Sequence, residues 1–189
     1  MGQVSWFIPA LWLVWALYWA AAAVSVKHAA RREPLWSRAA HIGPLLVAAW
    51  LLCAPQLPWP SLHASLPFAG DAAAWLGAVI ASLGLALTVW ARVHLGANWS
   101  GTVTVKQDHE LVRSGPYAWM RHPIYTGLLL MLAGTALALG EWRGVLALLI
   151  AFAALWRKLK LEERWMCETF GAAYDDYRRS VKALLPGIL

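Results

Sequence analysis

The stretch "PIYTGLLLMLAGTALALGEWRGVLALLIAFAALW", Pro123 to Trp156, holds two apolar runs that are separated by one short polar segment. The first run is Ile124–Leu139 and the second is Val145–Trp156, and "GEWRG" (140–144) lies between them. Because so short a connection joins neighbouring antiparallel helices, the stretch predicts a tight helical hairpin.

Three further apolar runs precede the hairpin, at Trp6–Val26, Ile42–Leu57 and Ala72–Ala91. The first has no charge and is long enough to span a bilayer core of about 30 Å. A cleavable signal peptide is the alternative for this run, but no basic region precedes it. The chain is 60% hydrophobic and only 14% charged, against about 25% in soluble domains. We therefore predict an all-α integral membrane protein, a single domain over residues 1–189 with about five transmembrane helices.

The basic residues predict the orientation. All of the 16 lysines and arginines except Arg143 follow the first run, lie between the third and fourth, or follow the fifth. Positive residues collect on the cytoplasmic side, so in a bacterial inner membrane the N-terminus is expected outside, and residues 92–122 and the C-terminal tail are expected in the cytoplasm. The net charge of +6 then fits contact with anionic membrane lipids and needs no nucleic acid partner.

The cysteines and tryptophans fit the same class of protein. Cys53 and Cys167 lie in or beside apolar runs without metal-ligand spacing, so neither a disulfide nor a metal site is predicted. The 14 tryptophans suit the interfacial belts of membrane proteins. Oligomeric state stays open.

Two polar segments, residues 92–123 and 156–186, flank the hairpin, so the chain brings them together at one end. In the first, "SGPY" (114–117) predicts a turn, and Pro123 suits the first turn of a helix. His122 is then at or near the N-cap, beside backbone N–H groups that favour negative charge. We expect a cytoplasmic site between the loop before the fourth helix and the extension of the fifth helix.

The second polar segment predicts a helix that Gly171 interrupts. Glu162 and Glu163 are about 100° apart on that helix and are expected not to face one point. Several side chains also have purely structural interpretations. Glu162 would pair with Lys158 at i, i+4; Arg121 would hold a lipid phosphate; His122 would only cap a helix; Tyr117 and Tyr125 would be interface anchors; and Arg92 and His94 would only mark a helix end.

The segments "LGANWS" (95–100), "HELVRSGPYAWMRHPIYTG" (109–127) and "EERWMCETFGAAYDDYRRSV" (162–181) resemble the membrane isoprenylcysteine carboxyl methyltransferases and their short bacterial relatives. The resemblance covers residues 92–186. It implies that residues 92–189, after the three transmembrane helices of residues 1–91, form a cofactor-binding catalytic region with the cofactor between the loop before the fourth helix and the extension of the fifth. It implies that S-adenosylmethionine binds without a Rossmann domain, and the sequence contains no G-x-G-x-x-G motif.

The resemblance also implies the site residues. The cofactor contacts would be Thr104, His109, Glu110, Leu111, Val112, Tyr117, His122, Pro123, Tyr125 and Glu162, where Thr104 requires a gap in the alignment. Backbone groups of 109–112 would hold the adenosine. His122 and the helix start would suit the methionine carboxylate, and Glu162 would suit the ammonium or sulfonium of the cofactor.

The implied substrate is a lipophilic carboxylate such as a prenylated cysteine C-terminus. The arginine that holds it in the family corresponds to Lys158 here, with Arg157 one residue before, so Glu162, Arg157 and Lys158 are the candidate catalytic residues. A lysine neutralises a carboxylate but lacks the bidentate fork of arginine. Arg92 and His94 are further candidates for substrate contact.

The residues themselves leave more than one function open. A carboxylate with a pKa of about 3.5 is ionised at neutral pH and needs no general base. A phospholipid N-methyltransferase would need one, and His122, His109 or Glu163 would serve. The chain is also compatible with an NADPH-binding protein resembling the sterol reductases and with a non-catalytic membrane protein.

Overall fold

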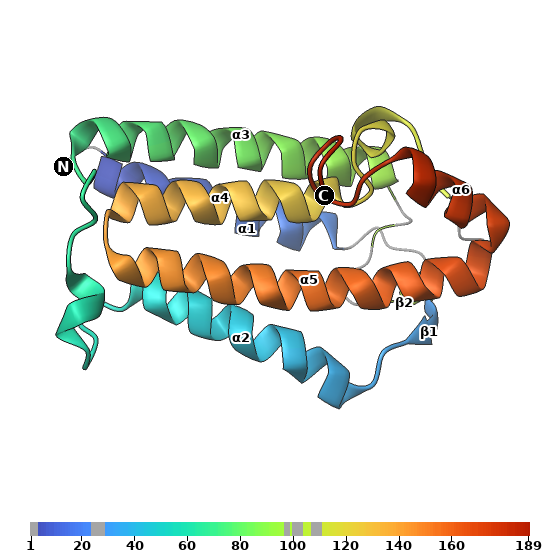
Figure 1. Ribbon diagram of the computed structural model, residues 1–189, viewed down its shortest axis with the longest axis horizontal. Coiled ribbons are helices and arrows are strands. Elements are labelled where there is room, and N and C mark those ends of the chain that lie inside the picture. Colours follow the sequence, from blue (N-terminus) through green and yellow to red (C-terminus); the bar gives the residue numbers. More distant parts are fainter. Residues whose placement is uncertain (1–3, 24–28, 97–98, 100–103, 107–110) are drawn as a thin grey trace.

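The computed structural model describes residues 4–23, 29–96, 99, 104–106 and 111–189. Its helices are α1 (Val4–Ala22), α2 (Leu35–Cys53), α3 (Asp71–Leu95), α4 (Pro123–Leu139), α5 (Trp142–Phe170) and α6 (Ala172–Ser180). Helices α1 to α5 lie lengthwise beside one another, while α6 and the strands lie at one end (Figure 1). The single-turn 3-10 helices are η1 (Pro60–His63) and η3 (Gly115–Ala118). Strand β1 (Ala29–Arg32) pairs antiparallel with β2 (Thr104–Lys106).

Each of the five predicted runs forms a helix, and the hairpin of α4 and α5 turns at Gly140 and Glu141 as expected. The predicted bounds of the second run were wrong, since α2 begins at Leu35 and ends at Cys53. A boundary drawn by hydrophobicity misses the first turns of α2, in which the polar residues Ser37 and His41 are buried. Pro55 disfavours helical continuation at the residue before it, which explains the earlier end.

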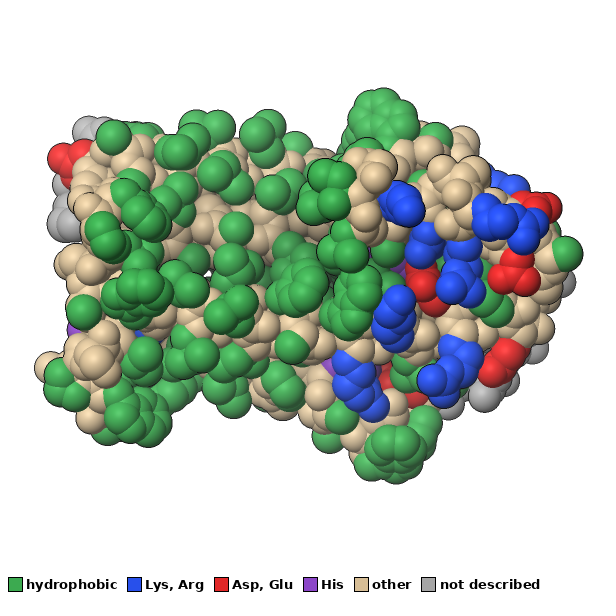
Figure 2. Space-filling model, in the orientation of Figure 1, with side chains coloured by type: hydrophobic (Ala, Val, Ile, Leu, Met, Phe, Trp, Pro, Cys, Tyr) green, Lys and Arg blue, Asp and Glu red, His purple; other side chains and the backbone are tan. Residues whose placement is uncertain are grey.

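The outer surface of the bundle is apolar. Helices α2 and α3 are long and apolar enough to cross a membrane. Leu13 of α1, Leu46 of α2 and Leu83 of α3 are 59%, 66% and 62% exposed, and green apolar side chains cover most of the long helices in Figure 2. A soluble monomer rarely exposes so extensive an apolar surface. The protein is therefore an integral membrane protein; the crossing of the other three helices, and the orientation, stay predictions.

Two pairs of glycines bring α3 and α4 into close contact. Gly77 faces Gly134, and Gly84 faces Gly127 one heptad further along both antiparallel helices. A Cβ added at Gly84 would lie only 2.5 Å from the carbonyl oxygen of Gly127. Small residues of this kind let membrane helices approach backbone to backbone. Helix α4, which lies between α3 and α5 in Figure 1, is thereby held rigidly as one wall of the site.

A hydrogen-bond network of His63, Glu141 and Arg143 stabilises the end of the bundle opposite α6. Nε2 of His63 accepts the N–H of Leu57 at 3.0 Å, so Nδ1 has the proton and donates to Glu141 Oε2, also at 3.0 Å. The same carboxylate oxygen accepts from Arg143 Nε at 2.7 Å, and Arg143 Nη1 donates to the carbonyl of Ala54. Arg143, the exception to the charge pattern, is thus a buried link between the α4–α5 turn and the end of α2.

The other end is closed by α6 and the C-terminal segment. Gly171 interrupts the long helix as predicted, with a φ of 52° that favours glycine. The chain then returns to the start of α4. There the N–H groups of Arg121 and His122 donate to the carbonyls of Lys182 and Ala183, both at 2.9 Å. These bonds attach the loop before α4 to the tail, so both polar segments meet as the sequence predicts.

Candidate functional site

The turn before α4 places the first group of predicted residues. Gly115 has a φ of 59°, and a Cβ there would lie 2.7 Å from the ring of His94, so only glycine fits comfortably. His94 Nε2 forms a 2.8 Å hydrogen bond with Ser114 Oγ. His122 is at the N-cap and Pro123 is the first helical residue, as predicted, although His122 makes no capping hydrogen bond. The turn therefore directs His122 away from the helix axis toward α5.

His122, Tyr125 and Glu162 form the centre of the site. The rings of His122 and Tyr125 are stacked, with centroids 5.5 Å apart and an interplanar angle of 2°. The Tyr125 hydroxyl donates to Glu162 Oε1 at 2.5 Å, and His122 Nδ1 lies 3.7 Å from Glu162 Oε2. Because α4 supplies two of these residues and α5 the third, the two predicted walls do face each other.

The expectation that Glu162 and Glu163 cannot face one point was wrong. His122 lies between them, with Nδ1 toward Glu162 and Nε2 3.5 Å from Glu163 Oε1. The two carboxylates do leave the helix in directions about 100° apart. The two nitrogens of one imidazole point in different directions as well, so a single histidine contacts both.

Glu163 is also bound by Arg121, whose Nε donates to Glu163 Oε1 at 2.8 Å. Burial alone would raise the pKa of Glu163, but the neighbouring His122 and the Arg121 guanidinium lower it to about 2. Arg121 also donates to the carbonyl of Val181 in the tail. This pair therefore joins the start of α4, the extension of α5 and the tail into one framework beneath the site.

The two adjacent basic residues of α5 face different neighbours. Lys158 Nζ lies 4.0 Å from Glu162 Oε1 and 5.3 Å from the ring centre of Tyr125. Arg157 instead faces α2, where its guanidinium donates to the backbone carbonyl of Ser37 at 3.1 Å and to the Ser37 hydroxyl at 3.3 Å. Of the two candidates for holding an acidic substrate, Lys158 is thus the one beside Glu162 and Tyr125.

The sequence analysis missed a polar cluster at the start of α2. Glu33, Ser37 and His41 are buried, with 4%, 4% and 2% of their surfaces exposed. Arg157 Nη1 lies 3.4 Å from His41 Nδ1, and His41 Nε2 lies 3.5 Å from Glu33 Oε1. The available signal was the one-turn spacing of Ser37 and His41 at the start of an apolar run, because polar and ionisable groups inside membrane helices are costly and often functional.

Arg92 is occupied by contacts near its own helix end. Its guanidinium donates to the carbonyls of Gly96 at 2.8 Å and Ala22 at 2.6 Å and lies 4.6 Å from the ring centre of Trp99. The residue is only 3% exposed. Arg92 and His94 therefore make their contacts at the end of α3, and none of their partners is a partner of Lys158. Substrate binding by Arg92 and His94 stays a prediction.

Tyr117 connects that end of α3 with α6. Its hydroxyl donates to the carbonyl of Ala91 at 3.4 Å, and the Tyr177 hydroxyl donates to the carbonyl of Tyr117 at 2.5 Å. Burial raises the pKa of Tyr117 well above its usual range, and burial raises that of Tyr177 to about 12. Both phenols therefore stay neutral at physiological pH and act as hydrogen-bond donors.

The remaining predicted cofactor contacts are only partly described. His109 and Glu110 lie outside the described residues, and Thr104 pairs with Arg32 through the backbone of β2. Leu111 and Val112 are half-buried. They directly precede a segment that is attached to α6, where Arg113 lies 5.3 Å from the ring centre of Tyr177.

The arrangement of charges suits a ligand that has both a positively charged group and a negatively charged group. Glu162 offers a carboxylate beside an aromatic face, and the His122 imidazole lies between Glu162 and Glu163, with Nε2 3.5 Å from Glu163 Oε1. The first N–H groups of α4 have no intrahelical acceptor and favour negative charge. Within the same described part of the chain, no group of three or more His, Cys, Asp or Glu side chains is arranged to hold a metal ion.

Comparisons with known proteins show the family of the chain. A family model described as phospholipid methyltransferase matches residues 72–173, more than half of the chain. The protein-S-isoprenylcysteine O-methyltransferase of Saccharomyces cerevisiae is 34% identical over 119 residues, which are 60% of this chain and 48% of that protein. The enzyme of the same name from Schizosaccharomyces pombe is 34% identical over 110 residues, 55% of this chain and 45% of that protein. The chain thus spans about half the length of these relatives.

A solved structure of the eukaryotic intramembrane Ras methyltransferase, isoprenylcysteine carboxyl methyltransferase, is similar in fold. The TM-score is 0.59 at 24% sequence identity, over 81% of this chain and 52% of that chain. At this identity the likeness supports the arrangement of the helices alone.

Proposed function

The chain belongs to the phospholipid methyltransferase family, and from that premise we propose that it transfers a methyl group from S-adenosylmethionine to the carboxylate of a lipid-tailed acceptor such as a prenylated cysteine. The names of the yeast relatives and the segments that resemble the isoprenylcysteine carboxyl methyltransferases support this acceptor class.

The observation that supports the proposal most is the position of Lys158. It is the basic residue that faces Glu162 and Tyr125, and it lies two residues beyond Trp156, where the apolar run of α5 ends. An acceptor whose tail lies among the apolar helices would present its carboxylate at this depth. A cation at that place attracts the acceptor and orients it beside the cofactor site.

The residues present fit S-adenosylmethionine. Glu162 and the stacked rings of His122 and Tyr125 suit a cationic sulfonium or ammonium, which aromatic faces also attract. The first N–H groups of α4, which begins directly after His122, suit the methionine carboxylate. When bound, S-adenosylmethionine supplies a methyl group activated by the positive sulfur.

The proposed methyl transfer to a carboxylate needs no general base from the protein. A C-terminal carboxylate has an ordinary pKa of about 3.5 and is ionised at neutral pH. This carboxylate would receive the methyl group that S-adenosylmethionine supplies, with a neutral thioether as the other product. In this scheme Lys158 orients the attacking carboxylate, Glu162 holds the donor, and the surrounding apolar helices exclude water.

A second candidate is methylation of a phospholipid amine, which the description of the matching family model favours. An ammonium headgroup must lose a proton before it attacks a methyl group. His122 would be the base in that case, because its Nε2 lies 3.5 Å from the Glu163 carboxylate, which would stabilise the imidazolium.

The test is a transfer assay with the full chain in detergent or lipid nanodiscs. Radiolabelled S-adenosylmethionine is offered with a farnesylated cysteine acid or with phosphatidylethanolamine, and NADPH binding is measured in parallel as the control for a reductase-like protein. Label on the farnesylated acid, in a base-labile ester, is the expected result. Label on the amine lipid alone would reject the carboxylate and select the second candidate; NADPH binding without S-adenosylmethionine binding would reject both.

Lys158→Gln tests the role of the facing cation. Loss of one charge-assisted contact should lower kcat/KM for the acceptor about tenfold to a hundredfold, while the Kd for the cofactor stays the same. Lys158→Arg should restore most of the activity, and Arg164→Gln on the exposed side of α5 is the matched control. An unchanged kcat/KM in Lys158→Gln would remove the residue from the acceptor site.

A further inference from the structure

A polar pocket lies at the end of the bundle with α6, and its lining does not include His122 or Glu162. Its volume is about 490 Å³, within the range usual for ligand sites. It is formed by α5, α6, the start of α4 and the tail, with the lining residues Arg121, Trp156, Lys160, Asp175, Arg178, Arg179, Lys182, Ala183, Ile188 and Leu189.

The lining is strongly basic, with five cationic side chains and one carboxylate. Three of the cations have acidic partners: Arg121 pairs with Glu163, Arg178 with Asp175 at 3.8 Å, and Arg179 with Asp176. The other two are Lys160 and Lys182, both exposed. With those three pairs neutralised, the lysines leave the pocket with an excess of positive charge.

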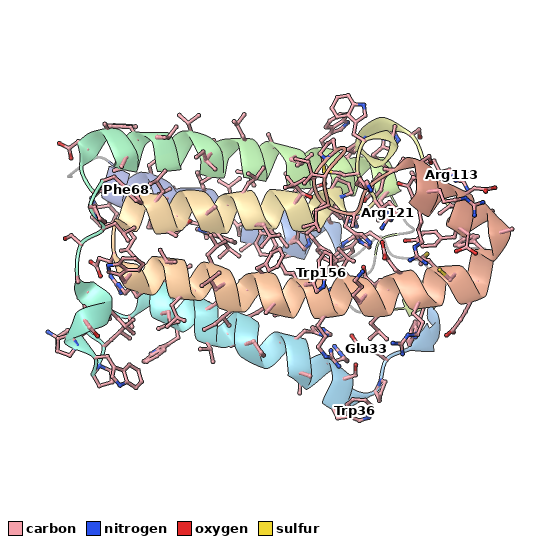
Figure 3. The ribbon with its side chains drawn as sticks, in the orientation of Figure 1. Glu33, Trp36, Phe68, Arg113, Arg121 and Trp156 are labelled. Carbon is pink, nitrogen blue, oxygen red and sulfur yellow. The ribbon has the colours of Figure 1, made fainter. Side chains whose placement is uncertain are left out.

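The pocket lies where the apolar surface ends. Trp156 is the last residue of the apolar run, and Lys160 lies one turn further along, 4.6 Å from the centre of the Trp156 ring. In Figure 2 the lysine and arginine side chains gather at the end with α6, directly beside the apolar surface of the long helices. Ile188 and Leu189 add apolar walls. Figure 3 shows Trp156 and Arg121 at this end of the α4–α5 hairpin.

We propose that this pocket binds the phosphate of an anionic lipid headgroup. A phosphate needs the cations, and a lipid also uses the apolar side of the pocket, because its first tail carbons would lie against Trp156 and Ile188 at the membrane interface. A soluble phosphate would gain nothing from those apolar walls. Interfacial tryptophan beside lysine is a common combination where membrane helices contact headgroups.

The lipid site is distinct from the proposed methyl-transfer site, although they are neighbours. Lys158 and Lys160 are two residues apart and therefore leave α5 in directions about 200° apart. Lys158 contacts Tyr125, whereas Lys160 contacts Trp156. The Arg121–Glu163 pair lies between the two sites, so the lipid would contact the outer side of the framework that also supports His122.

The experiment measures lipid binding to the full-length protein in detergent by native mass spectrometry. Phosphatidylglycerol, phosphatidylcholine and inorganic phosphate are the three probes. The wild type should bind phosphatidylglycerol more tightly than phosphatidylcholine. The double variant Lys160→Gln/Lys182→Gln should lose about tenfold to thirtyfold of that affinity, since each lysine near the headgroup contributes to the attraction.

Two controls separate charge from folding. The double variant Lys160→Arg/Lys182→Arg preserves both charges and should bind the anionic lipid like the wild type. Arg164→Gln removes a charge from the same helix outside the pocket and should change nothing. Equal binding of the two lipids by the wild type would overturn the proposal. Complete displacement of phosphatidylglycerol by millimolar phosphate would also overturn it, and would assign the pocket to a soluble anion.

Discussion

Replacing Glu162 by glutamine removes one charge from the centre of the site with little change of shape. The side chain is 21% exposed, and its Oε1 accepts the Tyr125 hydroxyl at 2.5 Å. An amide oxygen can accept the same hydrogen bond, so Glu162→Gln is expected to keep the packing of Tyr125. Its amide cannot attract a cationic ligand as the carboxylate does.

The expected loss follows from that single contact. A hydrogen bond or ion pair to a charged group contributes about 1.5–3 kcal/mol, and each 1.4 kcal/mol changes an affinity tenfold. The Kd for S-adenosylmethionine should therefore rise about tenfold to a hundredfold. Since Lys158 lies 4.0 Å from Glu162 Oε1, its charge would lose a partner and further weaken the binding of a cation.

The assay compares S-adenosylmethionine with S-adenosylhomocysteine by equilibrium binding. The second ligand retains the ammonium but lacks the positive sulfur. If Glu162 faces the sulfur, only the affinity for S-adenosylmethionine falls; if it faces the ammonium, both affinities fall together. Glu168→Gln, an exposed glutamate later on α5, is the matched control and should bind both ligands like the wild type.

One outcome contradicts the reasoning outright. If Glu162→Gln binds both ligands with wild-type Kd values and unfolds at the wild-type temperature, then Glu162 is only a structural partner of Tyr125 and Lys158. The cofactor site would then have to lie elsewhere.

Three further predictions concern the framework around the site. The pKa of Glu163 is lowered from its ordinary value of 4.5 to about 2, so its stabilising effect is complete above about pH 4.5 and is lost as the pH falls toward 2. Acid unfolding followed by circular dichroism should show this loss of stability. The variant Glu163→Gln should lack that part of the pH dependence and should be less stable than the wild type at pH 7. Gly84→Ala forces a methyl group against α4 and should destabilise the protein by about 1–3 kcal/mol in detergent unfolding, whereas Gly43→Ala, with open space around it, should be neutral or stabilising. His41→Leu removes a partner of Arg157 and should lower the unfolding temperature while the Kd for S-adenosylmethionine stays the same; a change of Kd alone would instead move the α2 cluster into the cofactor site.

Local features of the chain were predictable because local forces determine them. The hairpin follows from two apolar runs around a five-residue polar segment, the start of α4 from Pro123, and the break after α5 from Gly171. Turn chemistry and helix starts depend on residues within a few positions of one another. The meeting of the two polar segments followed as well, since a hairpin brings its flanks to the same end.

The tertiary structure alone decides which neighbours each polar side chain has. Sequence spacing could not separate Arg157 from Lys158, because the choice depends on how α2 packs against α5. Hydrophobicity alone also left out the first turns of α2, where the buried Ser37 and His41 have Arg157, far away in the chain, as a partner. The contact of His122 with both Glu162 and Glu163 likewise requires α4 and α5 to lie at one particular distance, which the close approach of Gly144 to Ala136 and the hydrogen-bonded tail help to set. The sequence by itself determined the helices and the end at which chemistry gathers; long-range packing determined which charges meet there, because such contacts depend on the summed geometry of several elements.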